Sequence, residues 1–167
     1  MLNLDVQRIA VGGDSAGGKM AAVCALQARD AGQALALQLL IYPDTAGYSE
    51  SVSRTQYAQG YVLEVKHIHY FFDSTLRNQN AGQWQFSPIN VEDHSSVAPL
   101  WLALAECDPL YDEGLDYADK LRVAGVTVNL EIYRGVTHEF IKMGRIIPEA
   151  RQFHQDAALA LKQAFKL

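Results

Sequence analysis

The topology of the chain can be inferred from one segment, Arg8-Ile9-Ala10-Val11-Gly12-Gly13-Asp14-Ser15-Ala16-Gly17-Gly18. Its apolar part, Arg8–Val11, predicts a buried strand that ends at two glycines. Residues 17–31 follow a helical pattern that Gly32 can end. Ser15 therefore falls on a tight strand-to-helix turn, and the G-x-S-x-G pattern around it is typical of a nucleophilic serine. The alternative is a glycine-rich turn that carries a serine by chance.

Apolar runs and helical patterns alternate along the rest of the chain. Further strands are predicted at residues 37–42, 99–105 and 126–133, with helices at 112–124 and from Pro148 onward. This alternation is typical of an α/β fold, a parallel sheet of about four strands with crossover helices, in a single domain over residues 1–167.

An insertion at about residues 44–98 interrupts the alternation. It is rich in Ser, Gly, Gln and Asn and contains one predicted helix, roughly from Glu64 to Arg77. So long a segment between strands is usually functional, which favours a lid or a substrate wall. The simpler interpretation is a surface excursion that covers the edge of the sheet.

Two further residues complete a candidate catalytic set. Asp108 directly follows the strand predicted at 99–105, and His138 follows the strand at 126–133. The order Ser15, Asp108, His138 and their position at carboxyl ends of parallel strands predict nucleophile, acid and base on one edge of the sheet. The backbone N–H groups of Ala16 and Gly17, at the positive end of the helix, are the candidate oxyanion donors. Taken singly, Asp108 could cap a helix and His138 could be an ordinary loop histidine.

Composition excludes several other classes of protein. The 167 residues are 49% hydrophobic and 20% charged, and the net charge of -5 without basic clusters argues against nucleic-acid binding. No apolar run approaches the roughly 20 residues of a membrane span, and the first residues do not form a signal peptide, so a cytoplasmic location is expected. Cys24 and Cys107 are predicted to be buried free thiols.

No metal and no cofactor are expected. Neither a His-Glu-x-x-His motif nor paired cysteines are present in the sequence. The remaining histidines do not follow strand ends and are interpreted as surface or packing residues: His67, His69, His94 and His154.

The chain resembles the bacterial hormone-sensitive-lipase-like esterases, an α/β-hydrolase family, and specifically the C-terminal portion of that fold. The matching phrases span nearly the whole chain: residues 8–18, Ile41-Tyr42-Pro43, Ser87-Pro88, residues 108–114 and Gly135-Val136-Thr137-His138-Glu139-Phe140. The resemblance implies hydrolysis of small-molecule carboxylic esters with short or medium acyl groups. It also implies the roles of nucleophile, acid and base for Ser15, Asp108 and His138.

Three departures from the family pattern matter. The family's upstream His-Gly-Gly-Gly loop, part of its oxyanion hole, is not found in these 167 residues, and Lys19 and Glu139 replace the commoner residues. We therefore expect low esterase activity from the chain alone. We also expect the strand at Arg8–Val11 to form an exposed edge that binds a second copy or a companion polypeptide.

Two alternatives remain open at this level. One is a non-catalytic fragment or binding module of the same fold. The other is a thioesterase or amidase on the same scaffold, because a fold alone does not determine the reaction.

Overall fold

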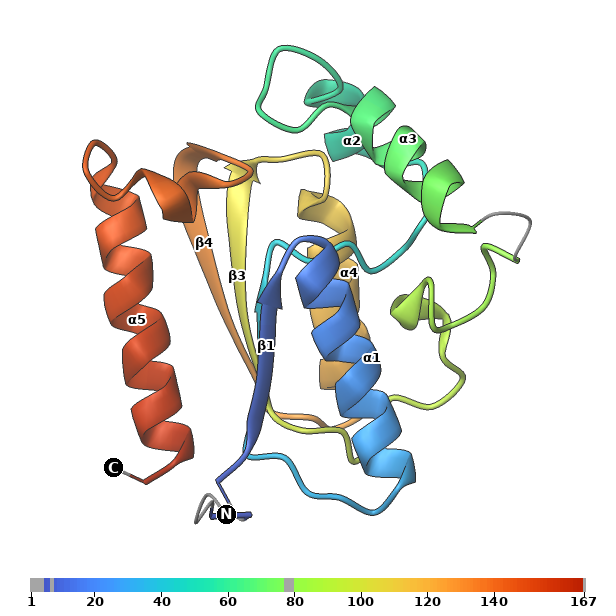
Figure 1. Cartoon of the computed structure of the whole chain (residues 1–167), viewed down its shortest axis with the longest axis vertical. Coiled ribbons are helices and arrows are strands. Elements are labelled where there is room, and N and C mark those ends of the chain that lie inside the picture. Colours follow the sequence, from blue (N-terminus) through green and yellow to red (C-terminus); the bar gives the residue numbers. More distant parts are fainter. Residues whose placement is uncertain (1–4, 7, 77–79, 167) are drawn as a thin grey trace.

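A computed structural model describes residues 5–6, 8–76 and 80–166 (Figure 1). It contains one sheet of four parallel strands in the order β1-β2-β3-β4, which confirms the predicted α/β fold. The strands are β1 (Ala10–Asp14), β2 (Leu37–Ile41), β3 (Leu100–Cys107) and β4 (Val128–Thr137).

Helices cover both faces of the sheet. Helices α1 (Ala16–Asp30) and α4 (Tyr111–Val123) pack on one face, and α5 (Pro148–Ala164) packs alone on the other (Figure 1). Because both faces are covered, all five residues of β2 are buried, which is usual for parallel strands. The short helix η2 (Phe140–Met143) lies between β4 and α5.

The insertion lies above the carboxyl ends of the strands. It contains α2 (Val52–Gln56), α3 (Val65–Leu76) and the short helix η1 (Pro88–Asn90), and Figure 1 shows α2 and α3 over that edge of the sheet. Ile68, Phe72 and Leu76 form the buried stripe of α3, as the sequence predicts. The predicted end of this helix at Arg77 lies outside the described residues.

The sequence pattern predicts that Met20, Val23, Cys24 and Ala28 share one face of α1, but the structure buries a different face. Ala21, Ala22 and Ala25 are buried against the sheet, whereas Met20 is 62% exposed. Small side chains let the helix approach the strands closely, and Leu26 is the one large apolar side chain of α1 that is fully buried. The prediction that both cysteines are buried is wrong, because Cys24 is exposed and Cys107 is half-buried, although both are free thiols.

Strand β1 also departs from the predicted boundaries. It runs through both glycines to Asp14, and it pairs with β2 alone among the described strands. A side chain at Gly12 would meet the carbonyl oxygen of Leu39 at 3.1 Å, which explains the glycine inside the strand. Its residues are half-buried except Gly12, which is exposed.

A bulge changes the register near the end of β4. Ala105 pairs with Tyr133 and Cys107 pairs with Thr137, so a single residue of β3 lies opposite residues 134–136 of β4. Gly135 adopts a φ of 67° there, and its N–H donates to Oε2 of Glu106 at 2.8 Å.

Candidate active site

Ser15 lies on the sharp turn between β1 and α1. Its φ of 53° and ψ of -121° are unusual for a residue with a side chain, and its N–H donates to the carbonyl of Ile41 at 2.9 Å. A Cβ at Gly13 would lie 2.4 Å from the carbonyl oxygen of Gly17, so only glycine fits at position 13. Such strained turns are frequent at functional sites.

The second glycine that the turn requires is Gly18. A Cβ there would lie 2.8 Å from Cβ of Pro43, whereas a Cβ at Gly17 would meet only Oδ1 of Asp14, at 3.9 Å. The G-x-S-x-G pattern predicts that the glycine two residues after the serine relieves crowding at the turn; this prediction is wrong for Gly17. The close approach that limits side-chain size is between α1 and the segment after β2.

The structure brings the three residues at the strand ends together. Nε2 of His138 lies 3.0 Å from Oγ of Ser15, and Nδ1 lies 2.6 Å from Oδ2 of Asp108. Oδ1 of Asp108 accepts the N–H of Leu110 at 2.9 Å, which fixes the carboxylate. Because the carboxylate of Asp108 accepts a hydrogen bond from Nδ1–H of His138, the proton stays on Nδ1. Nε2 is left to accept the proton of the serine hydroxyl.

Asp108 and His138 are shielded from water. Asp108 is 0% exposed and His138 is 3% exposed. Beside them, Ala16 and Gly17 begin α1, and within the described chain their backbone N–H groups have no recorded acceptor. Unpaired N–H groups at a helix start can hold a negatively charged oxygen next to Ser15.

Tyr42 is a site residue that the sequence argument missed. Its ring centroid lies 4.4 Å from that of His138, and the side chain is fully buried. Its φ is 34°, and its N–H donates to the carbonyl of Ala103 at 2.7 Å. Burial raises the pKa of Tyr42, and the nearby carboxylates of Glu139 and Asp14 add to the effect. The only available signal was the phrase Ile41-Tyr42-Pro43, whose contact with His138 depends on the tertiary fold.

Glu139, next to the histidine, is engaged elsewhere. It adopts a left-handed φ of 68°, and its carboxylate pairs with Nζ of Lys142. The hydrogen bond to Glu139 raises the pKa of Lys142, which also lies 3.9 Å from Oδ2 of Asp14.

A buried ion pair ties the insertion to the segment that carries the acid. Nη2 of Arg54 lies 2.6 Å from Oε2 of Glu113, and both side chains are 3% exposed. Oε1 of Glu113 accepts the N–H groups of Thr45 at 2.7 Å and Ala46 at 3.2 Å. Helix α2 is thereby fixed to the first turn of α4, close to Asp108.

A cavity of about 270 Å³ opens beside the serine. The insertion provides much of its apolar wall, so the segment predicted to be a substrate wall does border the candidate nucleophile. The lining residues are Ser15, Ala16, Lys19, Asp44, Leu63, Ile68, Phe71, Phe72, Thr75 and Leu110.

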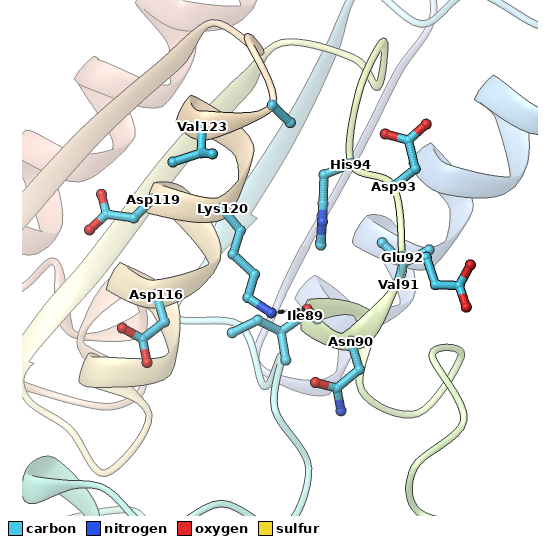
Figure 2. A pocket seen from close by; sticks show the side chains of 11 residues that line it. Ile89, Asn90, Val91, Glu92, Asp93, His94, Asp116, Asp119, Lys120 and Val123 are labelled. Atoms are coloured by element: carbon cyan, nitrogen blue, oxygen red, sulfur yellow. Dashed lines mark hydrogen bonds between the residues drawn. The ribbon is translucent and has the colours of Figure 1, made fainter.

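A second hollow, of about 710 Å³, lies away from these residues between α4 and the segment after η1 (Figure 2). Nζ of Lys120 crosses it to the carbonyl of Ile89 at 2.8 Å, as Figure 2 shows. Acidic side chains line its rim: Glu92, Asp93, Asp116 and Asp119. None of the candidate catalytic residues lines this hollow.

The remaining histidines lie apart from the site. His94 is buried with Nε2 3.3 Å from the carbonyl of Pro88, and burial lowers its pKa. His154 contacts the carbonyl of Ile141, while His67 and His69 are exposed. Within the described ranges, no group of three potential metal ligands occurs. No helix in the same ranges is long and apolar enough to cross a membrane.

The family model of the alpha/beta hydrolase fold matches residues 1–142, so the chain belongs to the α/β-hydrolase family. Within it, the relatives confirm the resemblance to hormone-sensitive-lipase-like esterases. An ethyl acetate hydrolase of Pseudomonas putida is 41% identical over 153 residues, covering 89% of this chain and 48% of that protein. The carboxylic ester hydrolase LipN of Mycobacterium tuberculosis is 38% identical over 143 residues, which cover 81% of this chain and 38% of LipN.

Solved structures give the same result. A thermostable esterase from Pseudomonas putida superposes with a TM-score of 0.92 at 36% identity, covering 96% of this chain and 52% of that one. The ester hydrolase EH1AB1 from the metagenome of Lake Arreo superposes with a TM-score of 0.92 at 37% identity. The match covers 98% of this chain and 52% of that one. The chain spans about half the length of these relatives, or less in the case of LipN.

Proposed function

We propose that this chain carries the catalytic residues of a serine carboxylic-ester hydrolase. The observation that carries the proposal is the continuous hydrogen-bonded series Asp108–His138–Ser15, which ends at an apolar cavity. Relatives that are named ester hydrolases support the same class of reaction. The roles are nucleophile for Ser15, general base for His138 and orienting acid for Asp108.

The reaction proceeds through an acyl-enzyme. Nε2 of His138 takes the hydroxyl proton of Ser15 as Oγ bonds to the ester carbonyl carbon, and Asp108 stabilises the imidazolium. The N–H groups of Ala16 and Gly17 hold the oxyanion. The bond to the alcohol oxygen then breaks, and His138 returns the proton to the departing alcohol. Water, deprotonated by His138, releases the carboxylic acid and restores Ser15.

The substrates are esters with short to medium acyl groups, in keeping with a cavity of about 270 Å³. The 167 residues contain no His-Gly-Gly-Gly segment, so the oxyanion is held by Ala16 and Gly17 alone. Loss of one oxyanion donor typically lowers turnover by roughly 10²–10³. We therefore expect slow hydrolysis from the 167-residue chain by itself.

The outer edge of β1 is the proposed contact with a partner, either a second copy or a companion polypeptide. This strand pairs on one side only in the described sheet, and its outward N–H and C=O groups can continue the ladder.

The test is hydrolysis of p-nitrophenyl butyrate by the chain beside Ser15→Ala, with mass-spectrometric detection of a fluorophosphonate adduct. We expect slow hydrolysis that the substitution abolishes, and one adduct on Ser15. Matched thioester and anilide substrates separate ester hydrolysis from the other acyl transfers. Equal rates for the chain and Ser15→Ala, with no adduct, would contradict the proposal.

A further inference from the structure

The cavity beside Ser15 contains a buried cation. Lys19 lies one turn further along α1 and lines the same cavity. Its side chain is 12% exposed, and Nζ lies 2.5 Å from Oδ2 of Asp44. Nζ also lies 4.0 Å from the ring centroid of Phe86 and 4.9 Å from that of Phe72. The ammonium group is thus held between a carboxylate and two aromatic faces.

This ion pair keeps unused hydrogen-bonding capacity. An ammonium group has three N–H donors, and Asp44 is the only oxygen partner recorded for Lys19 in the described chain. Oδ1 of Asp44 is buried and likewise has no partner among the described residues, although Asp44 is only 5% exposed. Oδ1 has almost no exposed surface and needs a donor, so only the remaining N–H groups of Lys19 can bind an oxygen of a ligand in the cavity.

Charge restricts what that ligand can be. The ion pair is neutral overall, so a carboxylate gains little net attraction from Lys19 beside Asp44, and an ammonium group gains little from Asp44 beside Lys19. An alkyl end would leave the donors of Lys19 unsatisfied while it displaced water from them. A neutral carbonyl or hydroxyl oxygen can accept a hydrogen bond from Lys19 without adding charge.

The distance between Ser15 and Lys19 also suits a neutral oxygen acceptor in the acyl group. Residues four apart on a helix have Cβ atoms about 6 Å apart, so Lys19 is one helical turn from the candidate nucleophile. A polar oxygen a few atoms beyond the ester carbonyl reaches this depth while the carbonyl stays at Ser15.

We propose that Lys19, held by Asp44, is a specificity-determining residue. It selects esters whose acyl group carries a neutral hydrogen-bond acceptor, a keto or hydroxyl oxygen, over esters with an alkyl group of the same shape. This inference rests on the proposed ester hydrolysis at Ser15.

The experiment compares methyl levulinate with methyl isocaproate, in which a methyl group replaces the keto oxygen. Proton release gives kcat/KM for each, and we expect the levulinate to be favoured about tenfold. Binding of the corresponding ethyl ketones, in which a methylene replaces the ester oxygen, is measured by NMR titration. These ketones cannot be hydrolysed, so their Kd ratio reports selectivity without turnover, and we expect the same preference.

Three variants test the assignment. Lys19→Met is expected to abolish the preference, and Lys162→Met, on the exposed side of α5, is expected to keep it. Because Lys19→Met leaves Asp44 buried without its cation, the double variant Lys19→Met/Asp44→Leu removes both charges and is expected to bind the alkyl ketone more tightly.

The outcomes are separable. If the chain binds the levulinate analogue more tightly than the isocaproate analogue, and this preference depends on Lys19, the inference holds. If no Ser15-dependent hydrolysis is then found, only the proposed function is contradicted. Equal Kd values for the two ketones in the parent chain overturn the inference, as does a preference that survives in the double variant.

Discussion

Ser15 keeps its left-handed backbone because its neighbours leave space for a very tight turn. A Cβ at Gly13 would lie too close to the backbone of Gly17, and a Cβ at Gly18 would lie too close to Pro43. A Cβ at Gly17 would meet only Oδ1 of Asp14, at 3.9 Å. The G-x-S-x-G pattern marks the turn correctly but does not identify which glycines are crowded. That distinction depends on the segment after β2, more than 20 residues away in the sequence.

A glycine-to-alanine series tests this difference. We expect Gly18→Ala to lower the free energy of unfolding by about 1–3 kcal/mol through overpacking, and Gly13→Ala to lower it at least as much. Gly17→Ala is the matched control, and alanine's helix propensity should leave it neutral or up to about 1 kcal/mol more stable. Urea unfolding followed by circular dichroism gives the three values. A loss for Gly17→Ala equal to that of Gly18→Ala would refute the geometric explanation.

The triad geometry could be predicted from the sequence because each residue directly follows a strand. Parallel strands bring their carboxyl ends to one edge, so chain order and strand ends were sufficient to place Ser15, Asp108 and His138. Tyr42 and Lys19 could not be identified in this way. Their importance depends on contacts with His138 and Asp44, which no local pattern encodes.

At the scale of elements, the ion pair between α2 and α4 is the main link from the insertion to the body. Burial raises the pKa of Glu113 from 4.5 to about 7, with a smaller rise from Asp44, while Arg54 opposes the shift. Between these two pKa values the folded chain binds more protons than the unfolded chain, and above about pH 7 Glu113 is the carboxylate that pairs with Arg54. This contribution to stability is fully present below pH 4.5 and is lost as the pH rises through about 7.

Glu113→Gln tests this linkage. We expect the free energy of unfolding of the parent chain to fall more steeply between pH 4.5 and 7 than that of the variant, because only the parent has a carboxyl at this position. Urea unfolding at several pH values gives both slopes. Asp119→Asn, at an exposed position of α4, serves as the control and should keep the parent slope. Parallel curves for parent and Glu113→Gln would disprove the assignment.

The strands and long helices could be predicted where the hydrophobic periodicity is strong. The buried face of a helix was predicted wrongly where small residues pack against the sheet. All four strands and the helices α1, α3, α4 and α5 were predicted, with ends shifted by a few residues. The sequence pattern placed Met20, Val23, Cys24 and Ala28 on one face of α1, but three alanines, Gly18 and Leu26 form the buried face. The short helices α2, η1 and η2 have too few residues for a periodic signal.

The described sheet has two edge strands, β1 and β4, and β4 carries the charged residues Glu131 and Arg134. β1 contains two glycines and only one acidic residue, Asp14, so little on it opposes further pairing. The proposed partner contact predicts self-association that increases with concentration. Light scattering coupled to size-exclusion chromatography should show dimers or larger species at high concentration.

A variant sharpens this measurement. Ala10→Pro should weaken the association, because it removes a backbone donor on the outer side of β1. Ser15 and Ile9 bond toward β2, so the N–H of Ala10, at the alternate position, faces away from it. Val123→Lys, at a 91% exposed position at the end of α4, provides a surface control that should associate like the parent. A parent chain that stays monomeric at all concentrations would exclude self-association through β1.

The bulge in β4 gives this scaffold room for evolutionary change. The ladder between β3 and β4 is complete up to Tyr133. Residues 134–136, which face a single residue of β3, lie between the end of this ladder and the segment that carries His138. A change of length in that short segment would alter the reach of the base toward Asp108 and leave the paired strands intact. An insertion or deletion in this segment can therefore shift His138 without rebuilding the sheet beneath it.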